Sequence, residues 1–138
     1  MKSMLPAYGT PAWTLTRKLE GADFEATVAK TIAALATEGF GVLATMDIAK
    51  TLATKIDTHI RPYVILGACN PKLAYGALGL EPGIGALLPC NVVVADEGDG
   101  VVVSAIDPRA MFAVVGNPAL DPIVDDVRAR LARVLAQV

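Results

Sequence analysis

Residues 63–71, with the sequence YVILGACNP, decide the fold. Pro62 favours an extended conformation at this point of the chain. The seven residues after it are apolar at odd and even positions alike. A strand that is apolar on both faces is typical of the interior of a sheet. Asn70 and Pro71 then supply a helix N-cap and a first helical residue. The stretch therefore predicts a central strand followed at once by a helix.

Towards the N-terminus, the pattern predicts a strand and an amphipathic helix. Apolar and polar residues alternate over 13–19, which is the period of a half-buried strand. Asp23 stands where an N-cap belongs, and apolar residues then recur at spacings of three and four as far as Gly39, a C-cap residue.

A second strand and helix are expected between Gly39 and Pro62. The strand covers 40–46, and we expect one face of it to carry Phe40, Val42, Ala44 and Met46. Asp47 can cap the helix that follows, whose apolar stripe consists of Ile48, Leu52 and Ile56.

Towards the C-terminus, we expect a compact connection, a hairpin and two helices. Residues 79–89 hold three glycines and two prolines, which indicates a shaped connection. Two β-branched runs flank the polar residues 96–100, which is typical of a β-hairpin. Asp107 and Pro108 can open a short helix, and the apolar residues of 120–138 recur with a helical period.

The order of elements, β-α-β-α-β-α-β-β-α, predicts one α+β domain over residues 1–138. We expect a sheet of about five strands with helices mainly on one face, and an irregular N-terminal tail over residues 1–10. Because the strands are largely apolar on both faces, we expect a second copy of the chain to cover the other face as a homodimer.

Composition excludes several partners. The 138 residues are 54% hydrophobic, and 12 Lys and Arg against 14 Asp and Glu give a net charge of −2 without a basic block, which disfavours nucleic-acid binding. No apolar run reaches the roughly 18–20 residues that cross a bilayer, so we expect no membrane association. The N-terminus lacks the apolar core of a secretory signal, so we expect a cytoplasmic protein.

Four segments of the chain carry a family resemblance: 65–71 (ILGACNP), 83–94 (GIGALLPCNVVV), 103–108 (VSAIDP) and 116–118 (GNP). They resemble the bacterial and archaeal family called domain of unknown function 302, and the resemblance runs from about Trp13 to the C-terminus. It implies a compact, dimeric α+β fold and no established activity.

Cys69 is the sharpest chemical feature, because it ends the central strand one residue before a helix N-cap. The positive end of a helix dipole stabilises an anion, so Cys69 could act as a nucleophile, a redox thiol or a metal ligand. Alternatively, it packs as a small hydrophobic residue, as most buried cysteines do.

Cys90 follows 21 positions later, at the start of the next strand. If the two strands are antiparallel, both thiols lie at one end of the sheet; if the strands are parallel, the thiols lie at opposite ends. A disulfide would be unusual in a reducing compartment. Two cysteines and one histidine do not make a structural zinc site, so Cu(I), with Met46 or Met111 as a further ligand, is the metal that fits best.

Four polar residues complete the candidate ligand-binding set with the two cysteines: Asn70, Asn91, Asp47 and Asp107. Asp47 and Asp107 stand between a strand and a helix, where ligands often bind in open sheets. Each also reads as an ordinary cap or turn residue.

Two functions follow from these patterns. The first is a module that binds a small ligand or a soft metal ion, or performs thiol redox chemistry, at Cys69 and the 79–90 connection. The second is a homodimeric interaction protein in which both cysteines are structural. No set of acid, base and nucleophile can be assembled, so we do not expect an enzyme, and no cofactor is required by the sequence.

Overall fold

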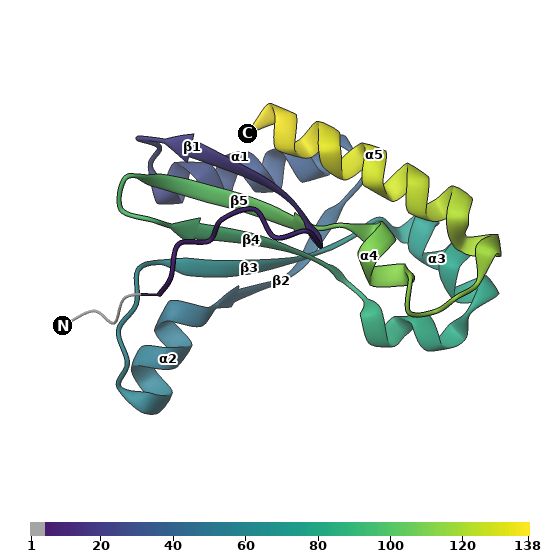
Figure 1. Cartoon of the computed structure of the whole chain (residues 1–138), viewed down its shortest axis with the longest axis horizontal. Coiled ribbons are helices and arrows are strands. Elements are labelled where there is room, and N and C mark those ends of the chain that lie inside the picture. The colour runs from purple at the N-terminus through teal and green to yellow at the C-terminus, as the bar shows by residue number, and fades with distance from the viewer. Residues whose placement is uncertain (1–4) are drawn as a thin grey trace.

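The computed structural model describes residues 5–138, and five of its segments form one sheet with the order β1-β5-β4-β3-β2 (Figure 1). The strands are β1 (Thr14–Glu20), β2 (Gly41–Asp47), β3 (Tyr63–Cys69), β4 (Cys90–Asp96) and β5 (Gly100–Ile106). Every neighbouring pair is antiparallel. The predicted α+β class and the order of elements are confirmed, and the apolar stretch 63–69 is an interior strand.

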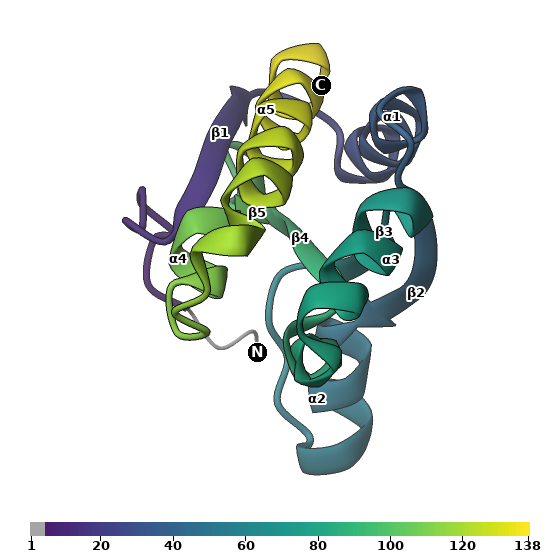
Figure 2. The ribbon, with the colours of Figure 1, turned by 90° about the vertical axis from the view of Figure 1, so that its right-hand side faces the viewer.

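The helices gather mainly on one face of this sheet (Figure 2). They are α1 (Phe24–Thr37), α2 (Ile48–Ile56), α3 (Pro71–Leu80), α4 (Pro108–Phe112) and α5 (Asp121–Gln137), with short 3-10 helices η1 (Pro82–Leu87) and η2 (Pro118–Leu120). The long helices α1 and α5 run roughly along the strand direction, whereas α2 projects from the edge of the sheet (Figure 1). Within residues 5–138, no helix is both long and apolar enough to span a bilayer.

Each helix that follows a strand begins at the residue that the sequence predicts. The side chains of Asp23, Asp47, Asn70 and Asp107 all accept a hydrogen bond from a backbone N–H in the first turn of the helix. These bonds satisfy donors that a helix N-terminus otherwise leaves free, so a short polar side chain fixes where each helix starts.

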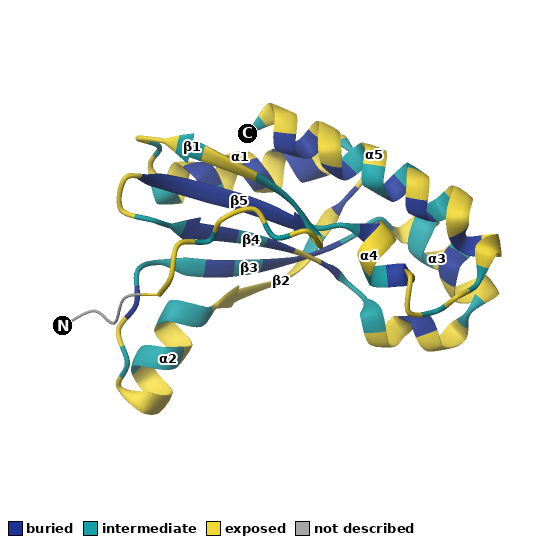
Figure 3. Cartoon of the chain, in the orientation of Figure 1, coloured by how far each residue is buried: buried dark blue, intermediate teal, exposed yellow. Residues whose placement is uncertain are grey.

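The core lies between the sheet and the α1–α5 layer. Leu66, Val92 and Val103 from three adjacent strands are fully buried, and they pack in one cluster with Leu35 of α1 and Leu131 of α5. Burying a side chain of this size stabilises the fold by roughly 1.5–3 kcal/mol. The buried residues are therefore shared between the strands β3, β4 and β5 and the helices that cover them (Figure 3).

The structure corrects one expectation about β2. Val42 lies opposite Ala68 and Ala44 lies opposite Gly67, so Leu43 is an extra residue in the ladder. Such a bulge changes which side chains share a face. Val42 therefore shares the helix-covered face with Ala68, whereas Ala44 and Met46 lie on the other face, and the predicted single face with Phe40 is wrong.

The face without helices is partly covered by the N-terminal segment, residues 5–13. This segment has no helix or strand, as predicted for residues 5–10, and residues 1–4 lie outside the described chain. Figure 1 shows the segment crossing β4 and β5, and the backbone N–H of Tyr8 donates a hydrogen bond to Glu97 at 3.1 Å. Ala95, Val102 and Ser104, whose side chains point to this face, are buried within a single chain. A second copy is not needed to cover this part of the face.

Candidate functional site

The antiparallel pairing of β3 and β4 brings the two cysteines to the same end of the sheet. Ala68 lies directly opposite Cys90, so Cys69 is one residue beyond that pair. Successive side chains of a strand point to opposite faces. The Cα–Cβ bond of Cys69 therefore points towards the helix-free face, and that of Cys90 points towards the core. This agrees with their burial, because Cys69 is half-buried and Cys90 is buried. Both thiols are free.

Both cysteines nevertheless border one small cavity at this end of the sheet. The cavity measures about 30 Å³, and it is lined by the cysteines, by Asn70 and by apolar residues of α3, α5 and the segment before β4. A single water molecule needs roughly 10–15 Å³ of such space. The cavity can therefore hold two or three water-sized groups, and an organic molecule does not fit.

Burial controls the acidity of the inner thiol. The pKa of Cys90 is raised to about 11, mainly because burial disfavours the thiolate and secondly because of the nearby Cys69 sulfur. Cys90 is therefore a neutral thiol at pH 7, and a ligand that binds its sulfur as a thiolate must displace a proton.

Pro89 closes the cavity from the connection before β4. A side-chain carbon added at Gly67 would lie 3.0 Å from the ring carbon Cγ of Pro89. Only glycine lets the proline ring approach β3 this closely. The Gly67 and Pro89 pair therefore explains how an apolar, proline-containing connection packs onto the central strands beside the cysteines.

The two asparagines near the cysteines have different environments. Asn70 accepts a hydrogen bond from the Leu73 backbone N–H at 3.3 Å and donates one to the backbone oxygen of Glu38, also at 3.3 Å. Asn91 is exposed and lies opposite Gly67 on the helix-free face. Asn70 thus joins the end of α1 to the start of α3, whereas Asn91 faces solvent and does not line the cavity.

Of the two predicted aspartates, only Asp107 lies at the cysteine end. Asp47 caps α2 through the Lys50 N–H at 2.9 Å and stands at the opposite end of β2. Asp107 follows β5 at the cysteine end, where one of its carboxylate oxygens is 3.3 Å from Nε of Arg128. Because it also caps α4, its carboxylate is already engaged by this chain.

The methionines and other candidate ligands do not complete a conventional metal site. Met46 lies on β2 opposite Ile65, whereas Cys69 lies opposite Gly41 at the other end of that strand. Met111 is partly buried and packs against the core clusters. Across residues 5–138, no group of three or more His, Cys, Asp or Glu side chains could hold a metal ion. Any metal at this end would therefore have the two sulfurs as its principal donors.

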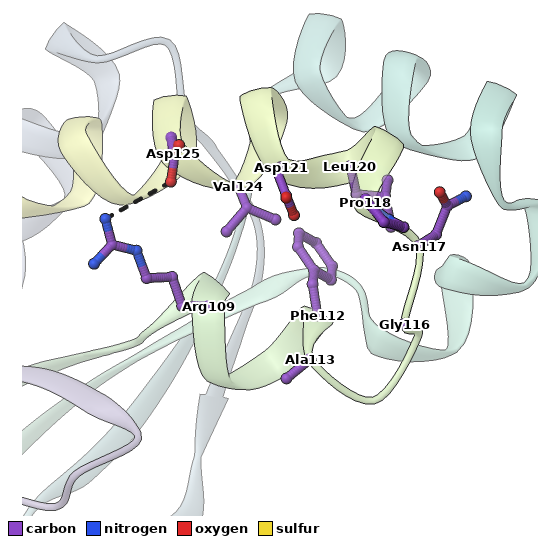
Figure 4. Close-up of a pocket in the computed structure, with 10 residues that line it drawn as sticks. All are labelled: Arg109, Phe112, Ala113, Gly116, Asn117, Pro118, Leu120, Asp121, Val124 and Asp125. Atoms are coloured by element: carbon purple, nitrogen blue, oxygen red, sulfur yellow. Dashed lines mark ion pairs between the residues drawn. The ribbon is translucent and has the colours of Figure 1, made fainter.

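The largest cavity was not predicted from the sequence. It measures about 520 Å³, opens to solvent between α4, η2 and the first turns of α5, and has Phe112 on its wall (Figure 4). At one end, Arg109 and Asp125 form an ion pair at 3.7 Å, with both side chains well exposed. All of its lining residues lie within 109–125, but the cavity depends on how α4, η2 and α5 turn back on one another, and the sequence pattern does not indicate this. The only hint was Gly116 and Asn117 within the family resemblance.

Comparison with known proteins agrees with the fold and is silent on activity. No curated protein matches the chain. A solved structure, the crystal structure of uncharacterized conserved protein DUF302 from Bacillus stearothermophilus, is similar with a TM-score of 0.84 and 29% sequence identity over 92% of this chain and 98% of that chain. The family model described as domain of unknown function DUF302 matches residues 15–138. The chain therefore belongs to the DUF302 family.

Proposed function

We propose that this protein is a thiol-based binding module whose ligand is a single soft metal ion, held at the cysteine end of the sheet. The observation that carries the proposal is that Cys69 and Cys90 border the same cavity of about 30 Å³. Of the ligand classes expected from the sequence, this volume favours an ion over an organic molecule.

The chemistry of the cavity wall selects the kind of ion. Thiolate sulfur is a soft donor that prefers Cu(I), whereas Mg²⁺ and Ca²⁺ require several oxygen ligands. Cu(I) is satisfied by two sulfur ligands, and the apolar residues around the site exclude competing water. Asn70 and Asn91 lie outside this donor set: Asn70 connects the cavity wall to the end of α1, and Asn91 faces solvent.

Proton release accompanies binding in this proposal. The Cys90 thiol, whose pKa is about 11, loses its proton as the sulfur–metal bond forms. Below pH 11 the apparent affinity therefore increases with pH, by up to about tenfold per pH unit for this one proton.

The test is anaerobic titration of the reduced protein with Cu(I) in the presence of a competing chelator, followed by native mass spectrometry. We expect one Cu(I) per chain, and we expect Cys69→Ala and Cys90→Ala each to lose it. Met46→Leu is the matched control, because Met46 also carries sulfur but lies at the other end of β2. Circular dichroism of the variants separates loss of binding from loss of folding.

Two results would contradict the proposal: no Cu(I) uptake by the reduced wild-type protein, or uptake that persists in the double Cys69→Ala, Cys90→Ala variant. Either result would favour the second candidate function, an interaction protein whose cysteines are structural. That candidate draws support from the burial of Cys90 in the main core cluster.

A further inference from the structure

The two edges of the sheet are protected very differently. In the described chain, β2 pairs only with β3, so its outer edge leaves backbone N–H and C=O groups unpaired by any strand. Six of the seven β2 residues are exposed. An exposed edge of this kind is a template for pairing with another strand.

Natural proteins usually block such an edge with charged side chains or proline. The outer strand β1 follows this rule, because it carries Arg17, Lys18 and Glu20. The sequence of β2, GVLATMD, has a single charge at its last position, Asp47, and no proline. Its one protective feature, the bulge, presents Leu43, which is 70% exposed.

Large apolar side chains are exposed on β2 and on the two helices that precede and follow it in the chain, α1 and α2. Met46 of β2 is 40% exposed, and Ile56 of α2 is 63% exposed. Ile32 of α1 is also exposed, on the side of the helix that faces away from α5. The Thr37 hydroxyl donates a hydrogen bond to Gln137, so Thr37 lies on the α5 side of α1. Ile32 is five residues earlier, which is about 140° around the helix, and it therefore faces away from α5. Figure 2 shows α5 on one side of α1 and open space on the other.

We propose that a second copy of this chain occupies the β2 edge, with the two β2 strands paired antiparallel about a two-fold axis. The two five-stranded sheets then form one continuous sheet. A two-fold interface uses the same surface of both copies, so the pairing brings a weakly charged, largely apolar strand against an identical one.

Charge placement supports this self-pairing. In an antiparallel pair centred on Ala44, the single acidic residue Asp47 lies opposite Gly41 of the partner strand, and the two Asp47 carboxylates lie at opposite ends of the interface. Like charges directly opposite each other would destabilise the pair. The uncharged residues 41–46 fill the rest of the interface.

The position of the apolar side chains favours a folded copy over an extended peptide. Ile32 lies in the helix layer, whereas Met46 lies on the helix-free face of the sheet. A single added strand would pair with the β2 backbone but would leave side chains of both layers in water. A second copy supplies its own helix layer and its own sheet face, and it covers both.

The first experiment is sedimentation equilibrium on the reduced, full-length protein across micromolar concentrations. We expect twice the mass of one chain for the wild type and the mass of one chain for Leu43→Lys. Tyr75→Lys is the matched control, because Tyr75 is 80% exposed on α3, a helix that packs against α5, η1 and η2. We expect this variant to remain dimeric. A monomeric wild type, or a folded Leu43→Lys variant that stays dimeric, would overturn the proposal.

A second experiment locates the two-fold axis. In a Cys69→Ser background, single cysteines are introduced in turn at positions 42 to 46, and the chains are oxidised. We expect at least one of these positions to give a covalent dimer, while Tyr75→Cys gives none. Cross-linking at Tyr75→Cys with none along β2 would assign the dimer to another surface and contradict the proposal. Cu(I) titration tests the Cys69 and Cys90 cavity, whereas sedimentation and cross-linking test the mass and the contacts of the assembly, so the two proposals can fail or succeed separately.

Discussion

The α5 side and the α2 side of this molecule differ in how much of each is buried. Six residues of β5 and five of α5 are buried, whereas α2 and β2 have no buried residue at all (Figure 3). Since apolar burial is the dominant favourable contribution to folding, the α5 side determines most of the stability. The α2 side contributes little and remains available for contacts with another molecule.

The largest difference between the two sides should come from truncating a core side chain. Leu131 of α5 is fully buried. We expect Leu131→Ala to lower the free energy of unfolding by roughly 2–5 kcal/mol, because it removes apolar contacts and leaves a cavity. Ile56→Ala on α2 should cost less than about 0.5 kcal/mol. Urea denaturation measures both variants, and equal losses would show that α2 belongs to the cooperative core.

The two cysteines provide an intermediate test of the same comparison. Cys90 belongs to the main core cluster, so Cys90→Ser places a hydroxyl group in apolar surroundings. We expect a loss of roughly 1–3 kcal/mol. Cys69 is half-buried, and Cys69→Ser should cost less than about 1 kcal/mol. A larger loss for Cys69 would indicate that its environment is tighter than its exposure suggests.

A smaller effect is expected where β1 joins α5. Arg17 donates hydrogen bonds to the backbone oxygens of Leu135 and Ala136, at 2.9 and 3.1 Å. We expect Arg17→Ala to lower the free energy of unfolding by about 1 kcal/mol, because two helix C-terminal carbonyls lose their partner. Lys55→Ala in the last turn of α2 is the control, and thermal melting of the two variants should separate them.

The smallest effect should be a change in pH dependence. The Arg133 guanidinium bonds the Glu38 carboxylate at 2.8 Å and lowers the pKa of that carboxyl below its ordinary value of 4.5. A depressed folded-state pKa contributes stability above the unfolded value, and this contribution is lost as pH falls through the folded pKa. We therefore expect wild type to lose stability relative to Glu38→Gln below about pH 4.5, measured by chemical denaturation from pH 6 to pH 3. Parallel pH profiles would contradict this role for Glu38.

Local sequence rules predicted the elements well because the signals that begin and end them are local. An aspartate or asparagine side chain reaches a backbone N–H two or three residues ahead of it, so Asp23, Asp47, Asn70 and Asp107 could be recognised without knowing the fold. The bulge at Leu43 was missed because it depends on pairing with β3, and nothing within β2 itself indicates an extra residue.

The candidate site could be predicted only in part. The sequence identified Cys69 and Asn70 at a strand-to-helix junction and Cys90 at a strand start. Whether the cysteines meet depends on strand direction and register, which long-range pairing decides. Asp47 was predicted to belong to the same site because it also stands at a strand-to-helix junction. Because β2 and β3 are antiparallel, the end of β2 that carries Asp47 lies at the opposite end of the sheet from Cys69.

By itself, the sequence determined the α+β class, the order of helices and strands and the residues at which α1 to α4 start, because hydrophobic periodicity and capping act within a few residues. The tertiary structure alone decided that Cys69 and Cys90 border one cavity, that the N-terminal segment crosses the open sheet face, and that β2 is an edge strand of the sheet. Each of these features joins segments far apart in the chain, so it exists only once the sheet has set their register.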